Sequence, residues 1–168
     1  MGKIFWGLLF LFLDIRLQGI LITPDFVGYI LIYFGVWELR QLETAKVVRL
    51  LCWAGLAVSG ISWLTVWSAS EELYMAVDLL SLGVQLWTTY ELVVMVEELE
   101  QQREAVLGSD RLCQRWKVMA VGLVSSLLLS RLHEWLAAAA LVVGVAAAVI
   151  YVVAFYRSKQ LLKQAEGA

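Results

Sequence analysis

The sequence predicts an all-α protein, a bundle of about six transmembrane helices. Its 168 residues are 61% hydrophobic and only 17% charged, and the mean hydropathy is +0.77. Soluble domains average about 45–50% apolar and about 25% charged residues. One core cannot hide this excess, because a chain of about 150 residues leaves roughly 30% of its unfolded surface exposed. We therefore do not expect a soluble globule, and the same composition excludes disorder.

Stretches of roughly 20 mostly apolar residues can cross a bilayer, and we expect six of them in a single membrane domain, 1–168. They cover about residues 4–22, 24–39, 48–67, 74–96, 116–132 and 135–156. Five spans are the alternative, because the segment 130–134 contains neither Gly nor Pro to separate the last two. We expect two helices there, since one helix over residues 116–156 would be about 60 Å long, about twice the hydrocarbon core.

The basic residues predict that both termini are cytoplasmic, because Lys and Arg gather in cytoplasmic loops. With the N-terminus inside, only Arg131 falls in an outer loop, and Arg16 falls within a span. The remaining basic residues all fall inside: Lys3, Arg40, Lys46, Arg49, Arg103, Arg111, Arg115, Lys117, Arg157, Lys159 and Lys163.

The segment 97–117 is the only sizeable loop, and we expect it in the cytoplasm. Its first part, Glu98–Glu104, is typical of a helical extension of the fourth span that ends by Gly108. Ser109 or Asp110 is then expected to cap the next helix.

A helix start is predicted at the outer surface, where a threonine precedes Pro24 and Asp25. The threonine suits the N-cap, the proline lacks an N–H that would be unpaired there, and the acid suits the positive first turn. Gly28 permits close approach by the first helix, and Tyr29 lies one turn beyond Asp25 on the same face. We favour a well-formed helical hairpin; the alternative is a small polar pocket of Asp25, Tyr29 and Asp14.

A polar cluster is predicted inside the spans, formed by Asp14, Arg16, Asp78 and Gln85. An ionisable group inside a bilayer costs about 2.5–3.5 kcal/mol on insertion scales, so each needs a partner or a wet cavity. Arg16 and Asp78 fall at similar depth, which makes a cross-helix pair a reasonable hypothesis. We favour a buried polar cluster that fixes helix register; the alternative is a hydrated path for protons or a small cation.

Small side chains favour helix contacts inside a bilayer. The sixth span carries such a stripe at helical spacing, formed by Ala140, Gly144 and Ala148. We expect it to pack within the chain, with self-association through the same residues as the alternative.

No motif for catalysis, metal binding or nucleotide binding occurs in the sequence, which lacks HExxH, GxSxG, a Walker loop and a dinucleotide fingerprint. The net charge of −2 offers no basic face for nucleic acid. We therefore expect a protein that is not an enzyme and that uses no metal or cofactor.

A family resemblance is carried by the run from Gly19 to Ile32, with Pro-Asp-Phe-x-Gly-Tyr at its centre, and by Gly35 and Glu38–Leu39. This run resembles a segment near the N-terminus of small uncharacterised multi-span membrane proteins of Gram-positive bacteria. The resemblance covers about the first 40 residues. It implies a bacterial plasma-membrane protein and carries no activity.

Together these features predict a membrane-embedded scaffold or accessory subunit, whose partners are the lipid bilayer and other membrane proteins. The alternative is a small transporter or channel that uses the polar cluster.

Overall fold

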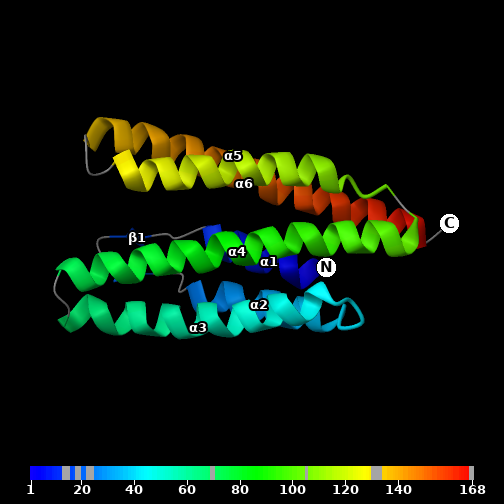
Figure 1. Cartoon of the computed structure of the whole chain (residues 1–168), viewed down its shortest axis with the longest axis horizontal. Coiled ribbons are helices and arrows are strands. Elements are labelled where there is room, and N and C mark those ends of the chain that lie inside the picture. Colours follow the sequence, from blue (N-terminus) through cyan, green and yellow to red (C-terminus); the bar gives the residue numbers. More distant parts are fainter. Residues whose placement is uncertain are drawn as a thin grey trace. The chain divides into compact units, whose positions relative to one another are not determined.

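The computed structural model describes residues 1–12, 16–17, 20–21, 25–68, 71–104, 106–129 and 134–166. Helices make up nearly all of this part of the chain (Figure 1), and so the predicted helical class is confirmed for it. They are α1 (Gly2–Phe12), α2 (Asp25–Trp37), α3 (Thr44–Ser68), α4 (Glu71–Arg103), α5 (Ser109–Leu129) and α6 (Glu134–Glu166). Between α1 and α2, the strands β1 (Arg16–Leu17) and β2 (Ile20–Leu21) pair antiparallel.

The predicted helix over residues 4–22 is wrong at these two strands. Arg16 lies opposite Leu21, and Leu17 lies opposite Ile20. The physical reason is local: the sequence places two charges, Asp14 and Arg16, and a glycine, Gly19, inside the apolar run, and glycine disfavours a helix by about 1 kcal/mol relative to alanine. Ile20 is β-branched and suits an extended backbone. Hydropathy alone therefore overestimated the length of the first helix, which ends at Phe12.

The chain divides into two compact units, Met1–Met95 and Val96–Ala168, each of which is described by itself. In the first unit α2 packs against both α1 and α3. In the second unit α5 and α6 are two separate helices, and they pack along each other. Of the predicted turn between them, residues 130–134, all but the last lie outside the described residues, and Glu134 is the first residue of α6. The prediction of a single membrane domain stays a prediction.

Three helical stretches are long and apolar enough to cross a membrane: Thr44–Ser62, Met75–Arg103 and Ala138–Leu162. They belong to α3, α4 and α6 and overlap three of the predicted spans, 48–67, 74–96 and 135–156. The helices α1 and α2 are apolar but have only 11 and 13 residues. Each is therefore about 17–20 Å long, shorter than a hydrocarbon core of about 30 Å.

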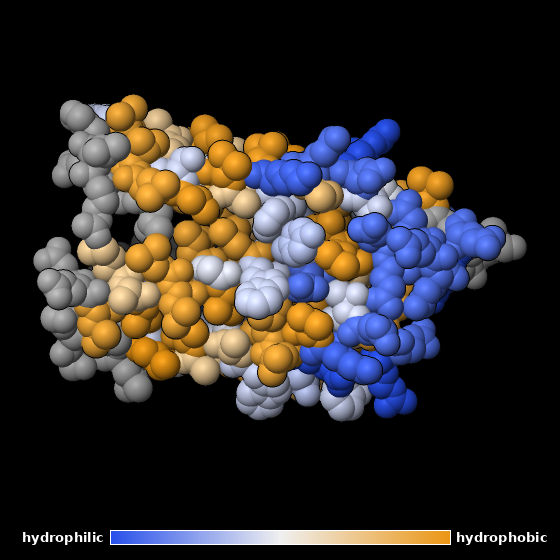
Figure 2. Space-filling model, in the orientation of Figure 1, coloured by the Kyte–Doolittle hydropathy of each residue, from blue (hydrophilic) through white to orange (hydrophobic). Residues whose placement is uncertain are grey.

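Hydrophobic and hydrophilic side chains occupy different parts of each unit. On the face drawn in Figure 2, hydrophobic side chains cover the bodies of the helices. Hydrophilic side chains gather near the α2–α3 turn in the first unit, and near the α4–α5 turn and the end of α6 in the second. Each unit thus has an apolar body and a polar end, as expected of helices that leave a bilayer at that end.

Candidate functional site

Part of the predicted polar cluster holds α4 against α1. Gln85 Nε2 donates a hydrogen bond of 3.3 Å to the backbone carbonyl oxygen of Leu11. Leu11 lies in the last turn of α1, where carbonyl groups lack partners within the helix. The Gln85 amide on α4 therefore gives a hydrogen-bond partner to a carbonyl group at the end of α1. This contact joins α4 to α1, and the register-fixing role of the whole cluster stays a prediction.

The rest of that cluster is only partly described. Asp78 is half-buried on α4, seven residues before Gln85 and so nearly on the same face. Asp14 and the side chain of Arg16 lie outside the described residues. The proposed pair between Arg16 and Asp78 therefore stays a hypothesis.

Glycines bring α1 and α2 into backbone contact. A Cβ atom added at Gly28 would lie 2.9 Å from the carbonyl oxygen of Gly7, and one at Gly7 would lie 2.7 Å from the carbonyl oxygen of Gly28. Seven residues further along α2, a Cβ at Gly35 would lie 2.8 Å from the backbone nitrogen of Ile4. Cβ atoms essentially never approach other heavy atoms within 3.0 Å. Only glycine permits this spacing, which is the close approach predicted at Gly28.

Tyr29 connects α2 to α3. Its side chain is buried, with 1% of its surface exposed. A Cβ at Gly55 of α3 would collide with the Tyr29 ring, so the absence of a side chain at Gly55 leaves room for the tyrosine. Asp25 lies in the first turn of α2, as predicted, whereas Pro24 and Asp14 lie outside the described residues. The alternative of a polar pocket shared with Asp14 therefore stays untested.

An aromatic and cationic cluster marks the polar end of the first unit. The ring centroid of Tyr33 lies 6.0 Å from that of Trp37 and 6.1 Å from that of Trp53. The guanidinium carbon of Arg49 lies 5.2 Å from the centroid of the Trp37 ring. Both tryptophans are about half exposed. Tryptophan and tyrosine gather where a membrane meets water, so this cluster is typical of an interfacial anchor.

An ion pair closes the same end of the unit. Lys3 Nζ donates a hydrogen bond of 2.7 Å to Glu38 Oε1, which joins the start of α1 to the turn after α2. Both side chains are about half exposed. The hydrogen bond from Lys3 holds the pKa of Glu38 below its ordinary value, against the opposing effect of partial burial.

Glu100 binds the beginning of α5, a role that the sequence did not predict. Its Oε1 accepts the backbone N–H of Leu107, and its Oε2 accepts that of Ser109, each at 3.1 Å. Gly108 between them has a φ of +79°, which favours glycine because it has no Cβ. Two N–H groups at the start of α5 thus receive a carboxylate, the charge that a helix N-terminus favours. The known capping box joins residues three apart, so it gives no signal for a contact nine residues apart.

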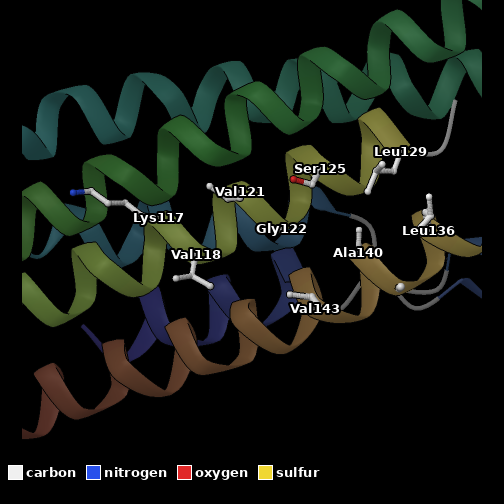
Figure 3. Close-up of a pocket in the computed structure, with 10 residues that line it drawn as sticks. Lys117, Val118, Val121, Gly122, Ser125, Leu129, Leu136, Ala140 and Val143 are labelled. Carbon is white, nitrogen blue, oxygen red and sulfur yellow. The ribbon is translucent and has the colours of Figure 1, made fainter. Parts of the chain in front are cut away.

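A groove with a volume of about 590 Å³ runs along α5 and α6 (Figure 3). Four of the lining residues are small: Gly122, Ser125, Ala139 and Ala140. The others are valines and leucines, except for Lys117 at one end of the groove.

Beside the groove, α5 and α6 approach closely where both have glycine. A Cβ at Gly122 would lie 2.9 Å from the Cα of Gly144. Gly144 and Ala148 are buried within the second unit, and Ala140 lines the groove. The small-residue stripe on the sixth span therefore packs against α5 over part of its length. Self-association through this stripe stays untested.

Among the residues that the structure describes, no group of three or more His, Cys, Asp and Glu could hold a metal ion. The described contacts are thus those of packing, capping and anchoring. They define the class of the protein: helical, with three helices long and apolar enough to cross a membrane. Compared with known proteins, the chain matches no family model, no curated protein and no solved structure.

Proposed function

We propose that this chain is a small multi-pass membrane protein that works by association, as a membrane-embedded scaffold or accessory subunit. One observation carries the proposal: a broad apolar face on α6 is left uncovered. Leu141, Val142 and Val149 have 51%, 69% and 55% of their surfaces exposed. Monomeric soluble proteins rarely expose so continuous an apolar surface, whereas a membrane protein offers it to lipid or to the helices of a partner.

The use of Gln85 supports association over transport. A hydrated path needs polar groups that can exchange partners with water or an ion. The Gln85 amide is instead bonded to the backbone of α1. The proposed role of this polar cluster is therefore to fix how α1 and α4 meet.

The finer arrangement that we propose is six crossings in the bacterial plasma membrane, with both termini in the cytoplasm. The distribution of basic residues supports this orientation. α5 would cross beside α6, because the two helices pack along each other. α1 and α2 would need residues beyond their described ends to reach across, given their lengths.

The association role is tested by truncating the exposed face of α6. Val142→Ala together with Val149→Ala removes bulk from positions seven apart, which lie on one face. A partner cross-linked to the full chain in intact membranes and identified by mass spectrometry should be recovered at a lower yield with this variant. The matched control is Val124→Ala together with Leu128→Ala on the exposed face of α5. Equal recovery with both pairs would contradict a role for the α6 face.

Transport is tested separately in liposomes that contain the purified full chain. We expect no proton or cation flux above that of empty liposomes. Flux that Asp78→Asn abolishes, and that Asp110→Asn on the exposed start of α5 leaves unchanged, would overturn the proposal in favour of a small transporter or channel.

A further inference from the structure

We propose that the groove on α5 and α6 binds one acyl chain of an anionic phospholipid, with the lipid phosphate held at Lys117. The inference goes beyond the association role proposed above. It needs only that the chain resides in a membrane.

The apolar part of the groove fits a lipid tail in size and chemistry. Its volume of about 590 Å³ falls within the range of about 300–1,000 Å³ that is usual for ligand pockets. Apart from Lys117 and Ser125, every lining residue is a glycine, alanine, valine or leucine. From Lys117 to Leu129 the groove follows α5 for about 18 Å, a little more than half of a hydrocarbon core of about 30 Å. A tail that enters at Lys117 therefore finds an apolar path about as deep as one leaflet.

Lys117 supplies the charge that selects the headgroup. Its side chain is exposed and has no ion-pair partner among the described acidic side chains. Figure 3 shows its amine at one end of the groove, pointing away from the apolar residues. A lysine at this depth extends its amine towards the headgroups while its carbon stem stays in contact with apolar groups. Arg111 and Arg115 precede it by roughly 9 Å and 3 Å along the helix axis, and they add positive charge at the same end.

A phospholipid satisfies this combination better than another helix does. An apolar helix laid in the groove would offer no counter-ion to the Lys117 ammonium at its end. An anionic lipid brings a phosphate and an apolar tail together, in the same order as Lys117 and the groove. Basic residues beside pockets between membrane helices are a recognised way of binding such headgroups.

The proposal is tested by native mass spectrometry of the full chain in detergent, with added phosphatidylglycerol or phosphatidylcholine. Lys117→Gln should lower the affinity for phosphatidylglycerol about fivefold, the factor that corresponds to about 1 kcal/mol for one lysine near an anionic headgroup. It should leave the binding of phosphatidylcholine unchanged. Lys46→Gln, which removes the same charge from exposed Lys46 in α3, is the matched control and should change neither.

A second variant tests the tail site without altering charge. Ala139→Leu fills the groove and should weaken the binding of both lipids, whereas Ala146→Leu, at an exposed site of α6 that does not line the groove, should have no effect. Equal losses from Lys117→Gln and Lys46→Gln would overturn the proposal, because the attraction would then be diffuse. Lipid binding that Ala139→Leu leaves unchanged would also overturn it. A native chain that is a dimer and an Ala139→Leu variant that is a monomer would overturn it as well, because a second copy of the chain would then occupy the groove.

Discussion

At the scale of single residues, the pairs of atoms that meet across helices limit what can be substituted. Gly28 faces the carbonyl oxygen of Gly7, a backbone atom that cannot rotate away as a flexible side chain would. Gly83 in α4 has nothing within 4 Å of the position that its Cβ would take. Both glycines lie inside helices, and so they differ in surroundings and not in secondary structure.

We expect Gly28→Ala to destabilise the protein by about 1–3 kcal/mol, the usual cost of overpacking. The added methyl group would force α1 and α2 apart. Gly83→Ala should cost nothing, because its methyl group enters open space and alanine favours a helix. Thermal unfolding of both variants in detergent, followed by circular dichroism, measures the difference. Equal melting temperatures would contradict a backbone contact between α1 and α2.

The Lys3–Glu38 pair predicts a small dependence of stability on pH. The pKa of Glu38 is lower in the folded chain than in the unfolded one. Its contribution is therefore complete above the unfolded pKa and is lost as the pH falls through the folded pKa. Because the pair is half exposed, we expect at most about 1 kcal/mol.

Glu38→Gln should therefore lower stability at pH 7 and lower it less at pH 3, because protonation of the native glutamate removes the same charge. Glu43→Gln, in the turn between α2 and α3, removes the same charge outside the contact with Lys3 and is the control for loss of charge alone. Urea unfolding at both pH values measures the difference. A deficit of Glu38→Gln that is as large at pH 3 as at pH 7 would mean that the carboxylate charge does not explain it.

Single residues could be predicted from the sequence where the signal lies within one helix. Gly28 and Gly35 are seven apart and share a face of α2, so their contact with the first helix could be expected. The partners of Tyr29 and Gln85 could not. Gly55 and Leu11 lie far from them in the sequence, and no spacing rule joins residues on different helices.

At the scale of elements, Glu100 determines how α5 begins. Its carboxylate accepts two backbone N–H groups that would otherwise lack partners. Glu97, three residues earlier in α4, is exposed and takes no part in these contacts. The two glutamates thus have the same side chain and lie in the same helix, but only Glu100 accepts hydrogen bonds from the start of α5.

We expect Glu100→Ala to destabilise the α4–α5 turn by about 0.5–2 kcal/mol, the usual cost of losing a helix cap. The amides of Leu107 and Ser109 should then exchange faster with deuterium. Glu97→Ala should leave both exchange rates unchanged. Hydrogen exchange followed by mass spectrometry of the full chain resolves this segment. Unchanged rates in Glu100→Ala would show that the turn holds without the carboxylate.

The lengths of the elements show where hydropathy succeeds and where it fails. The helical extension after the fourth span was predictable, since Glu98–Arg103 has strong helix formers and no breaker. α4 does continue to Arg103. The end of α1 was not predicted, because a long apolar average hid the charges of Asp14 and Arg16 and the glycine at position 19. Local conformational propensity determined the backbone conformation there, although the apolar composition of the stretch favoured a membrane-spanning helix.

At the scale of the whole molecule, apolar composition and the placement of basic residues predict two different properties of the chain. Composition predicts that lipid solvates the outside, and α3, α4 and α6 contain stretches long and apolar enough to cross. Charge placement predicts only the direction of crossing. A labelling experiment on the two flanks of one helix can therefore test direction and crossing together.

The flanks of α4 offer that experiment. Ser70→Cys places a thiol before α4, on the predicted outer side, and Gln101→Cys places one at its exposed far end. A membrane-impermeant maleimide should label Ser70→Cys on intact cells and Gln101→Cys only after the cells are broken. The native chain is the control, because Cys52 is buried and Cys113 is half-buried near the predicted cytoplasmic side. The reverse pattern would show that the orientation is opposite to the predicted one. Labelling of both variants from one side would show that α4 does not cross the membrane, since its flanks would then face the same solution.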